Sequence, residues 1–296
     1  MGTELTTRER MTKVYNHEEP DRLPRHDSPW PATTRRWHGE GLPEGVTPAE
    51  FFEWDTFRTI ATDNSPRFPA KTVEETDEYT IFTTNWGSTM KNFRTHSSVP
   101  EFLDFRIVDR ESWAEAKERM TPSEDRVDWK HLEENWPIWE AEGAWINGHG
   151  WFGYDVFASW VSGTERILMA LVDDPEWVRD MIDTALDMNL AMLSMVWDRG
   201  YHFHAVHWCD DMGYRNGPFF SLETYRSVEK PAQKRLIDWC HDRGIVANLH
   251  SCGNIEPLVP ELVEIGLDGL NPLEQKAGMD VFELKEKYGD KLTLEG

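Results

Sequence analysis

The second half of the sequence alternates short apolar segments with longer amphipathic ones, and this alternation constrains the fold more than any other feature. It is typical of βα units, in which parallel strands are joined by helices that cover the sheet. From residue 144 onward the unit repeats four times. The predicted strands are residues 144–147, 203–208, 245–250, 269–273 and 291–294, and the predicted helices are 175–200, 222–243, 255–265 and 281–288. Because strand-helix-strand connections are right-handed almost without exception, the sheet must close into a (β/α)8 barrel or stay open with helices on both faces.

The first half of the sequence is less regular. A capping box at Thr6 and Glu9 predicts a short helix, and the proline that follows favours an extended segment, which we predict to be a first strand at residues 22–26. Two further elements are predicted, a strand at 79–84 and a helix at 112–120. No repeat or low-complexity linker marks a domain boundary. We therefore expect a single domain over residues 1–296, with residues 1–20 as a helical lead-in.

Charge and composition limit the function. The chain has 31 Lys and Arg residues against 54 Asp and Glu residues, so 31 − 54 gives a formal charge of −23, which disfavours binding to nucleic acid or to an anionic membrane. Fifteen Trp residues and 39% hydrophobic residues predict a folded chain. No long apolar run or signal segment is present, so we expect a cytoplasmic protein. Three cysteines are too few for a disulfide framework and fit reduced thiols or metal ligands.

The sharpest local motif is His250-Ser251-Cys252-Gly253-Asn254, at the end of a predicted strand. Side chains two residues apart in an extended segment point the same way, so His250 and Cys252 can converge at the carboxyl end of the strand. Sites in parallel α/β domains lie at that end. Imidazole and thiolate together suit Zn²⁺, and Gly253 allows the backbone to turn away after the second ligand. The alternative is a capped turn with a half-buried thiol, because two ligands alone do not make a metal site.

The preceding strand brings more polar residues to the same edge. In a regular strand His207 and Cys209 share one face while Trp208 takes the other, so only one of these sets can face inward. Two aspartates end the strand, and the second, Asp211, could bind a metal or a substrate, transfer a proton, or cap a loop. Three candidates follow later strands: Asn271, Glu274 and Glu295. Glu274 is the preferred oxygen ligand or acid among them.

Residues 148–153 read Gly-His-Gly-Trp-Phe-Gly and fit the G-x-G-x-x-G pattern of dinucleotide-binding loops. Trp151 and Phe152 would place bulk where a pyrophosphate approaches bare backbone, and no clear helix starts at Gly153. We therefore interpret the segment as a rim loop, with an NAD-dependent oxidoreductase as the alternative. The residues expected to line an aromatic cleft there are His149, Trp151, Phe152 and Tyr154.

Taken together, these motifs resemble the uroporphyrinogen decarboxylase superfamily, and within it the corrinoid-linked methyltransferases. The H-x-C-G-N motif at residues 250–254 is the most specific part of the resemblance. The other matching segments are Glu19-Pro20-Asp21-Arg22-Leu23-Pro24, Asp210-Asp211-Met212-Gly213, Asn271-Pro272-Leu273-Glu274 and Tyr288 to Gly296. The resemblance covers both ends and the second half of the chain, whereas residues 30–140 match only in outline.

The resemblance implies a (β/α)8 TIM barrel of the uroporphyrinogen decarboxylase type. For the methyltransferases it also implies Zn²⁺ held by the H-x-C pair and by a third cysteine far downstream, which places the first two ligands on His250 and Cys252. No cysteine follows Cys252. We therefore expect either that Glu274, Asp211 or Cys209 completes the site, or that the chain is truncated, because it ends within the expected eighth strand.

The leading hypothesis from the sequence is methyl transfer between a corrinoid protein and a small thiol, or a methoxylated or methylated substrate. Glu274 and Asp211 are the expected catalytic residues. The expected substrate-binding residues are His149, Trp151, Tyr154, His207, Trp208 and Asn271. One alternative is a uroporphyrinogen decarboxylase-like carboxy-lyase, disfavoured by the acidic chain and by the lack of that enzyme's N-terminal Arg-Gln-Ala-Gly-Arg segment. The other is a non-catalytic relative that only binds a corrinoid or a corrinoid protein.

Overall fold

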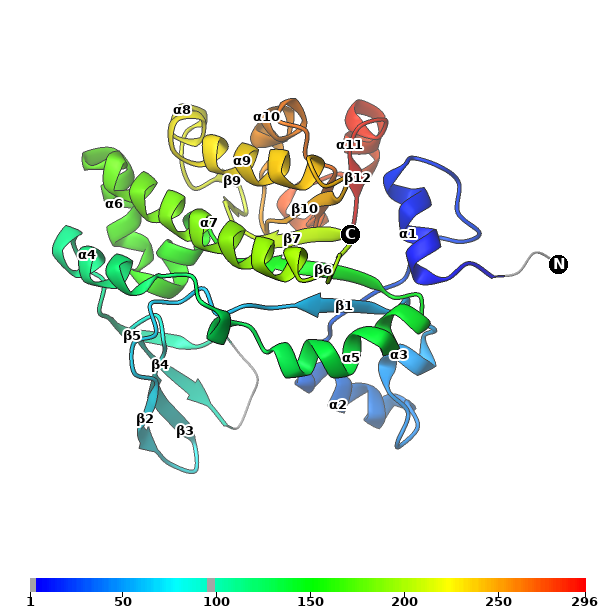
Figure 1. Ribbon diagram of the computed structural model, residues 1–296, viewed down its shortest axis with the longest axis horizontal. Coiled ribbons are helices and arrows are strands. Elements are labelled where there is room, and N and C mark those ends of the chain that lie inside the picture. The colour runs from blue at the N-terminus through cyan, green and yellow to red at the C-terminus, as the bar shows by residue number, and fades with distance from the viewer. Residues whose placement is uncertain (1–3, 95–98) are drawn as a thin grey trace.

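A parallel sheet forms the centre of the computed structural model, which describes residues 4–94 and 99–296 (Figure 1). Six strands follow one another in the order β1-β6-β7-β10-β11-β12, and every neighbouring pair is parallel. The strands are β1 (Phe57–Ile60), β6 (Trp145–Gly150), β7 (Ala205–Cys209), β10 (Val246–His250), β11 (Gly269–Asn271) and β12 (Thr293–Leu294). The α/β class with a parallel sheet is thus confirmed. Within the described residues no pairing joins β12 to β1, so closure into an eight-stranded barrel stays a prediction.

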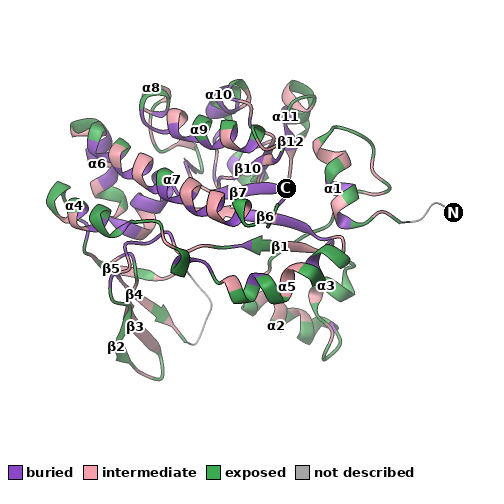
Figure 2. Cartoon of the chain, viewed as in Figure 1, coloured by how far each residue is buried: buried purple, intermediate pink, exposed green. Residues whose placement is uncertain are grey.

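Helices follow the strands and cover one side of the sheet, as Figure 1 shows for α7, α9, α10 and α11. The helices after β6 are α6 (Thr164–Asp173) and α7 (Pro175–Asp198), and those after β7 are α8 (Leu222–Thr224) and α9 (Lys230–His241). Those after β10 and β11 are α10 (Val259–Glu264) and α11 (Val281–Tyr288). In Figure 2 buried residues follow the strands and the inner faces of these helices, where the main hydrophobic core lies. The predicted βα alternation is therefore confirmed.

The predicted helix at 222–243 is interrupted. A π-helical segment (Tyr225–Glu229) separates α8 from α9. Pro231 lies in the first turn of α9, and because proline has no backbone N–H it cannot continue the hydrogen-bond ladder of the preceding helix. Asp174 precedes α7, but its carboxylate does not cap that helix and instead binds Arg110 at 2.5 and 2.8 Å.

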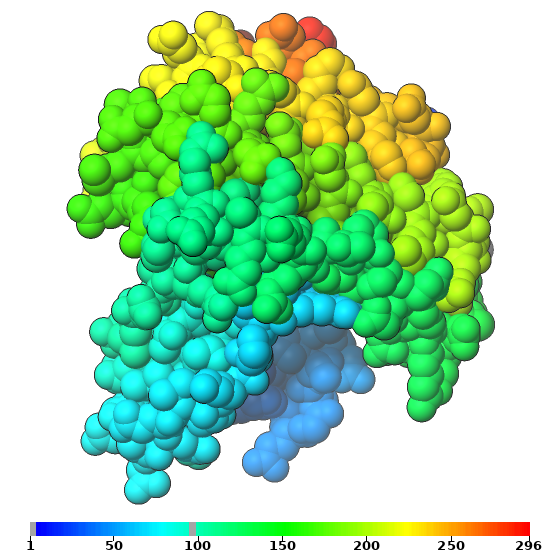
Figure 3. All heavy atoms as spheres, turned by 60° about the vertical axis from the view of Figure 1, so that its left-hand side comes forward, coloured from blue at the N-terminus to red at the C-terminus, as the bar shows by residue number. Residues whose placement is uncertain are grey.

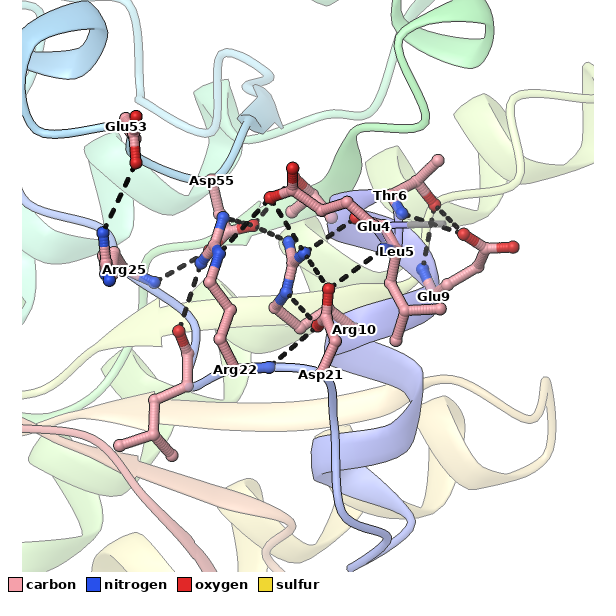
Figure 4. Close-up of polar contacts among 12 residues, drawn as sticks. Glu4, Leu5, Thr6, Glu9, Arg10, Asp21, Arg22, Arg25, Glu53 and Asp55 are labelled. Carbon is pink, nitrogen blue, oxygen red and sulfur yellow. Dashed lines mark hydrogen bonds and ion pairs between the residues drawn. The ribbon is translucent and has the colours of Figure 1, made fainter. Parts of the chain in front are cut away.

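The N-terminal segments are held by charge. Helix α1 (Thr7–Tyr15) begins at the predicted capping box, whereas residues 22–26 form no strand, which corrects the prediction. We call Arg10, Asp21, Arg22 and Asp55 the N-terminal ion cluster (Figure 4). Arg10 Nε binds Asp21 Oδ1 at 2.8 Å and its guanidinium also binds Asp55, while Arg22 Nη1 binds Asp55 Oδ2 at 2.8 Å. These ion pairs hold residues 21–25 next to β1. One backbone hydrogen bond, from Asp55 N to the Arg25 carbonyl at 2.7 Å, adds to them.

A second, antiparallel sheet lies near the carboxyl end of β1 (Figure 1). Its strands are β2 (Lys71–Glu75), β3 (Tyr79–Thr83), β4 (Ser88–Phe93) and β5 (Glu101–Phe105). Only β3 was predicted, because the strands are short and partly exposed and so lack a clear alternation. Figure 3 brings this side forward and shows the cyan surface of the sheet continuing into the teal and green segments that follow it.

The remaining elements are short or lie outside the βα units. The helices are α2 (Pro31–Glu40), α3 (Pro48–Phe51), α4 (Arg110–Arg119) and α5 (Trp129–Ala141), and a hairpin pairs β8 (Gly213–Tyr214) with β9 (Gly217–Pro218). Helix α4 confirms the prediction at 112–120. Among the described residues, which exclude 1–3 of the predicted lead-in, no helix is both long and apolar enough to span a membrane.

Candidate metal centre

Three side chains from two neighbouring strands meet at the carboxyl edge of the sheet. His250 ends β10, Cys252 follows it by two residues, and Asp211 follows β7. His250 Nε2 lies 3.3 Å from Cys252 Sγ and 3.7 Å from Asp211 Oδ1. One potential ligand atom from each residue lies within 4.8 Å of the other two. The prediction that side chains two residues apart would bring His250 and Cys252 together is thereby confirmed. Of the expected candidates for the third group, the structure brings Asp211 next to them.

The imidazole of His250 is oriented by its other ring nitrogen. Nδ1 lies 2.7 Å from Oδ1 of Asn271 on β11, and Asn271 Nδ2 donates to Asn248 Oδ1 at 2.9 Å. An amide oxygen can only accept, so Nδ1 carries the proton and Nε2 presents its lone pair toward Cys252. This arrangement is typical of metal-binding histidines, whose second nitrogen is held by a neighbouring acceptor. Asn271 therefore positions His250, and its predicted contact with substrate stays a prediction.

The same network reaches both ends of the described chain. Asn248 Nδ2 donates to Glu295 Oε1 at 2.6 Å, and the Tyr15 hydroxyl donates to the same oxygen at 2.7 Å. His207 Nδ1 lies 2.6 Å from Asn248 Oδ1, and burial lowers the pKa of His207 to about 4. His207 therefore lies on the same face of the sheet as Asn248 and His250, which answers a question that the sequence left open.

The loop after His250 is held by carboxylates. Cys252 N donates to Asp211 Oδ1 at 2.7 Å, and Gly253 N donates to Glu274 Oε2 at 3.0 Å. Gly253 has a φ of +79°, and a Cβ there would lie 2.3 Å from the Gly213 backbone, so glycine is required at this turn. Glu274 is exposed and is not among the three grouped ligands. Of the candidates for third ligand, the geometry favours Asp211.

Two thiols near the edge differ in position. Cys209 lies opposite His250 in the β7 to β10 register, and burial followed by the charge of Asp211 raises its pKa to about 12. Burial and then the charge of Asp211 also raise the pKa of the Cys252 thiol to about 12. Only Cys252 belongs to the grouped ligands in the described part of the chain. The third cysteine, Cys240, is fully buried in the core.

The G-x-G-x-x-G segment serves packing. Gly148 and Gly150 lie within β6, and Gly153, with a φ of +112°, would place a Cβ 2.4 Å from the Asp210 carboxylate. Glycine is therefore needed for the close approach of Asp210. Tyr154 and Trp208 are 1% and 0% exposed, which corrects their prediction as substrate contacts. The rings of both residues point into the core, where Trp208 stacks on Phe152.

Two cavities lie between the antiparallel sheet and the carboxyl edge. The first, of about 410 Å³, lies between Phe102 and Phe105 of β5, the π-helical segment Val156–Val161 and Asp211. The second, of about 620 Å³, lies beside the carboxyl ends of β1 and β6. Its lining includes Trp86, Met90, His149, Trp151 and Trp160. Trp160 lines both cavities, and Ser88 on β4 donates to its carbonyl. Because Asp211 lines the first cavity, that cavity opens beside the candidate metal centre.

Four carboxyl groups form what we call the site acid cluster: Asp155, Asp210, Asp211 and Glu229. Asp210 is 0% exposed and accepts hydrogen bonds from Asp155 N at 3.0 Å and from Gln233 Nε2 at 3.2 Å. Glu229 is buried and close enough to interact with Asp210, but neither of its oxygens has a well-formed hydrogen bond to a described residue. Burial raises the pKa of both groups; the charges of Asp155 and Asp211 raise that of Asp210 further, and the charge of Asp210 raises that of Glu229, so the pair holds a proton at neutral pH.

Asp155 links this pair to the first cavity. Burial, opposed by the Ser159 hydroxyl, raises the pKa of Asp155 to about 6. Asp155 and Glu229 were not predicted as site residues, since they lie on helical segments distant in sequence from the H-x-C motif. One sequence signal could have identified Glu229: it is a charged residue on the apolar face of a helix, where burying an acid costs free energy.

Comparisons with known proteins agree with the resemblance. Residues 154–296 match the family model described as uroporphyrinogen decarboxylase (URO-D). Among solved structures, the chain is similar to a methyltransferase from Methanosarcina mazei, with a TM-score of 0.63 and 15% sequence identity over 99% of this chain and 83% of that chain. At this identity the likeness shows the fold alone. No curated protein matches the chain. The matched region contains all three grouped ligands, and within that region the superfamily predicted from the motifs is confirmed.

Proposed function

We propose that this chain, whose residues 154–296 carry the uroporphyrinogen decarboxylase pattern, is a zinc-dependent methyltransferase. It would move a methyl group between a corrinoid on a partner protein and a small thiol or methylated substrate. The observation that carries the proposal is the convergence of Asp211, His250 and Cys252 beside a cavity of substrate size. We further propose that the parallel sheet belongs to a (β/α)8 barrel, whose carboxyl edge would be the docking face for the corrinoid protein.

The donor set fits Zn²⁺ at a catalytic site. Imidazole nitrogen, thiolate sulfur and carboxylate oxygen are all zinc ligands, and three protein ligands leave a fourth position for a substrate. Asp211 faces the first cavity, so that position would open toward it. When bound, zinc would lower the pKa of a substrate thiol and keep it as a nucleophilic thiolate at neutral pH.

The chain's own residues supply positioning. Asn271 keeps the His250 proton on Nδ1, so Nε2 remains an acceptor directed at the ligand group. Asp211 and Glu274 take the two successive N–H groups of the Cys252 loop, which fixes the thiol relative to the imidazole. Reactants held in this way react faster because little orientational freedom remains to be lost.

A carboxy-lyase acting on a polycarboxylate is the weaker candidate. Its support is the description of the matching family model. Neither cavity is lined by a described Lys or Arg, whereas both contain aspartate. A substrate with several carboxylates would be repelled by such a lining.

Metal analysis tests the proposal most directly. Wild-type protein loaded with zinc and dialysed should retain about one zinc ion per chain, and His250→Ala and Cys252→Ala should each lose it. Cys240→Ala is the matched control, because that thiol is buried away from the site and should not affect zinc content. Absence of bound zinc in the wild-type protein would contradict the proposal. Thiol-dependent demethylation of methylcobalamin would then be measured on the same preparations.

Asp211→Asn sharpens the ligand assignment. The amide keeps the shape of the carboxylate but binds zinc far more weakly, so zinc affinity should fall by tenfold or more. Glu274→Gln is its control, since Glu274 holds the loop without belonging to the grouped ligands. If Glu274→Gln lost zinc while Asp211→Asn kept it, the third ligand would be Glu274.

A further inference from the structure

The first cavity combines aromatic walls with negative charge. Phe102 stacks on Phe105 with ring centroids 5.8 Å apart, and Trp160 meets Phe102 edge to face at 5.5 Å. Asp155 and Asp211 also line the cavity, and no Lys or Arg is among its described lining residues. Aromatic faces attract cations, most strongly where water is excluded. The lining therefore favours a positively charged ligand.

Asp155 has the features of an unsatisfied counter-ion. Its residue is 9% exposed, and its carboxylate accepts a hydrogen bond from the Ser159 hydroxyl and interacts with the Trp160 side chain. It forms no ion pair with any residue in the described ranges, although the buried carboxylate Asp55 pairs with two arginines. A buried carboxylate without a cation is costly, and a bound cation would offset that cost.

The wall chemistry also distinguishes between kinds of cation. A primary ammonium has three N–H donors that each require an acceptor, whereas a trimethylated ammonium has none and buries apolar methyl groups. The three aromatic rings, together with Val99 and Ala158, offer apolar contact to such methyl groups, and the side-chain acceptors of the lining are Asp155, Ser159, Thr164 and Asp211. The formal charge of −23 would further draw cations to the protein.

We propose that this cavity holds the methylated ammonium group of a small organic cation, with Asp155 as its counter-ion. The inference rests on the proposed function, because the thiol or methyl group that reacts would lie at the other end of the same molecule, beside Cys252 and His250. The aromatic rings recognise the ammonium end, and the metal centre recognises the reacting end. The substrate class is thus a cationic thiol or a cationic methylated compound.

Calorimetric titration with a matched ligand pair tests the charge. Choline carries the trimethylammonium group, and 3,3-dimethyl-1-butanol replaces its nitrogen with carbon at nearly the same shape. Wild-type protein should bind choline at least about tenfold more tightly than the neutral isostere, and added salt should narrow the difference. Equal affinity for the two compounds, or no choline binding, would overturn the inference without any variant.

Two variants locate the binding. Asp155→Asn should weaken choline binding by about tenfold or more and leave the neutral isostere unaffected, because only the charge is removed. Asp104→Asn is the control, since Asp104 is exposed on the same strand as the two phenylalanines but does not line the cavity. Phe102→Leu keeps apolar volume but removes one ring, and should weaken choline binding several-fold. Unchanged choline binding in both Asp155→Asn and Phe102→Leu would place the cation elsewhere and refute the assignment.

The two proposals fail in different ways. Choline binding is measured on zinc-loaded and zinc-free protein, and on His250→Ala. If zinc is retained but choline does not bind, this inference fails and the proposed function stands. If choline binds with the expected selectivity but no zinc is retained, the cation site stands and the zinc-dependent mechanism fails.

Discussion

The N-terminal ion cluster and the site acid cluster both contain buried carboxyl groups, but their charges are balanced differently. In the first, two arginines surround two aspartates, and Arg10 and Asp55 have side chains only 2% and 1% exposed. In the second, four carboxyl groups lie together without an arginine or lysine bound to any of them in the described part of the chain. The first arrangement stabilises the fold on its own. The second costs stability unless protons or ligands neutralise it, which is typical of functional sites.

The two clusters also respond to pH in opposite directions. Hydrogen bonding to Arg10 lowers the pKa of Asp21. At Asp55 burial raises the pKa, but the hydrogen bonds from Arg22 and from the Arg25 N–H, together with the charges of Arg10 and Arg22, lower it overall. Their contribution to stability is present above the ordinary aspartate pKa and is lost as the pH falls below it. The raised pKa values of Asp210 and Glu229 mean that the folded state holds protons that the unfolded chain releases. Their contribution therefore weakens as the pH rises above about 4.

Disrupting the N-terminal ion cluster should have the largest effect on stability. Asp55→Asn leaves Arg10 and Arg22 without their shared carboxylate, and Arg10 has little access to water. The free energy of unfolding should fall by about 3–5 kcal/mol, as is usual when one partner of a buried ion pair is removed. Urea denaturation followed by circular dichroism at pH 7 measures the change. A loss below about 1 kcal/mol would mean that the cluster is not a stabilising element.

Introducing a steric clash into the site acid cluster should have the next largest effect on stability. Gly153→Ala introduces a Cβ 2.4 Å from the Asp210 carboxylate and forces an L side chain to a φ of +112°. We expect a loss of about 2 kcal/mol or more from strain and displacement of Asp210. Gly39→Ala is the control, because nothing lies within 4 Å of its Cβ position in α2, and it should be neutral or slightly stabilising. Equal stabilities for the two variants would show that Asp210 can move freely.

Neutralising one acid should change the pH dependence. Glu229→Gln removes a group whose raised pKa destabilises the folded state at high pH. Relative to wild type, the variant should gain at least about 1 kcal/mol of stability between pH 5 and pH 8. Denaturation midpoints at several pH values provide the measurement. If the denaturation midpoints of the two proteins changed with pH in the same way, Glu229 would not have a raised pKa in the site acid cluster.

The smallest effect is expected at an exposed ion pair. Arg8 and Glu140 form a hydrogen-bonded pair at 2.7 Å, but their side chains are 29% and 41% exposed. Glu140→Gln should therefore cost less than about 1 kcal/mol, and less still at high salt. A cost comparable with that of Asp55→Asn would indicate that burial is not what separates the two cases.

The parts of the fold and site that follow local rules could be predicted from the sequence. Alternating apolar segments located the strands β6, β7, β10, β11 and β12, and the spacing of two placed His250 and Cys252 together. Parallel register explains why residues after β7 and β10 meet, so Asp211 was a candidate as well. These inferences need only the period of a strand and the common direction of its neighbours.

Other parts depend on contacts that no local pattern contains. The expected strand at 22–26 is absent because Asp21 and Arg22 are drawn to Arg10 and Asp55. Asp155 and Glu229 join the site only through the packing of helical segments against β7. Tyr154 and Trp208 were assigned to the cleft by residue type, and only tertiary packing determines that both rings are buried.

The hydrogen bond from Tyr15 to Glu295 has a consequence for biosynthesis. It joins residues 280 positions apart, and Glu295 in turn contacts Asn248, which holds both Asn271 and His207. While the chain is being synthesised, α1 emerges from the ribosome long before its partner does. Contacts over such a separation form late because a long loop must first be closed. The orientation of His250 would therefore be completed only after residue 295 has left the ribosome, so a shorter nascent chain would not yet hold the candidate site in its final geometry.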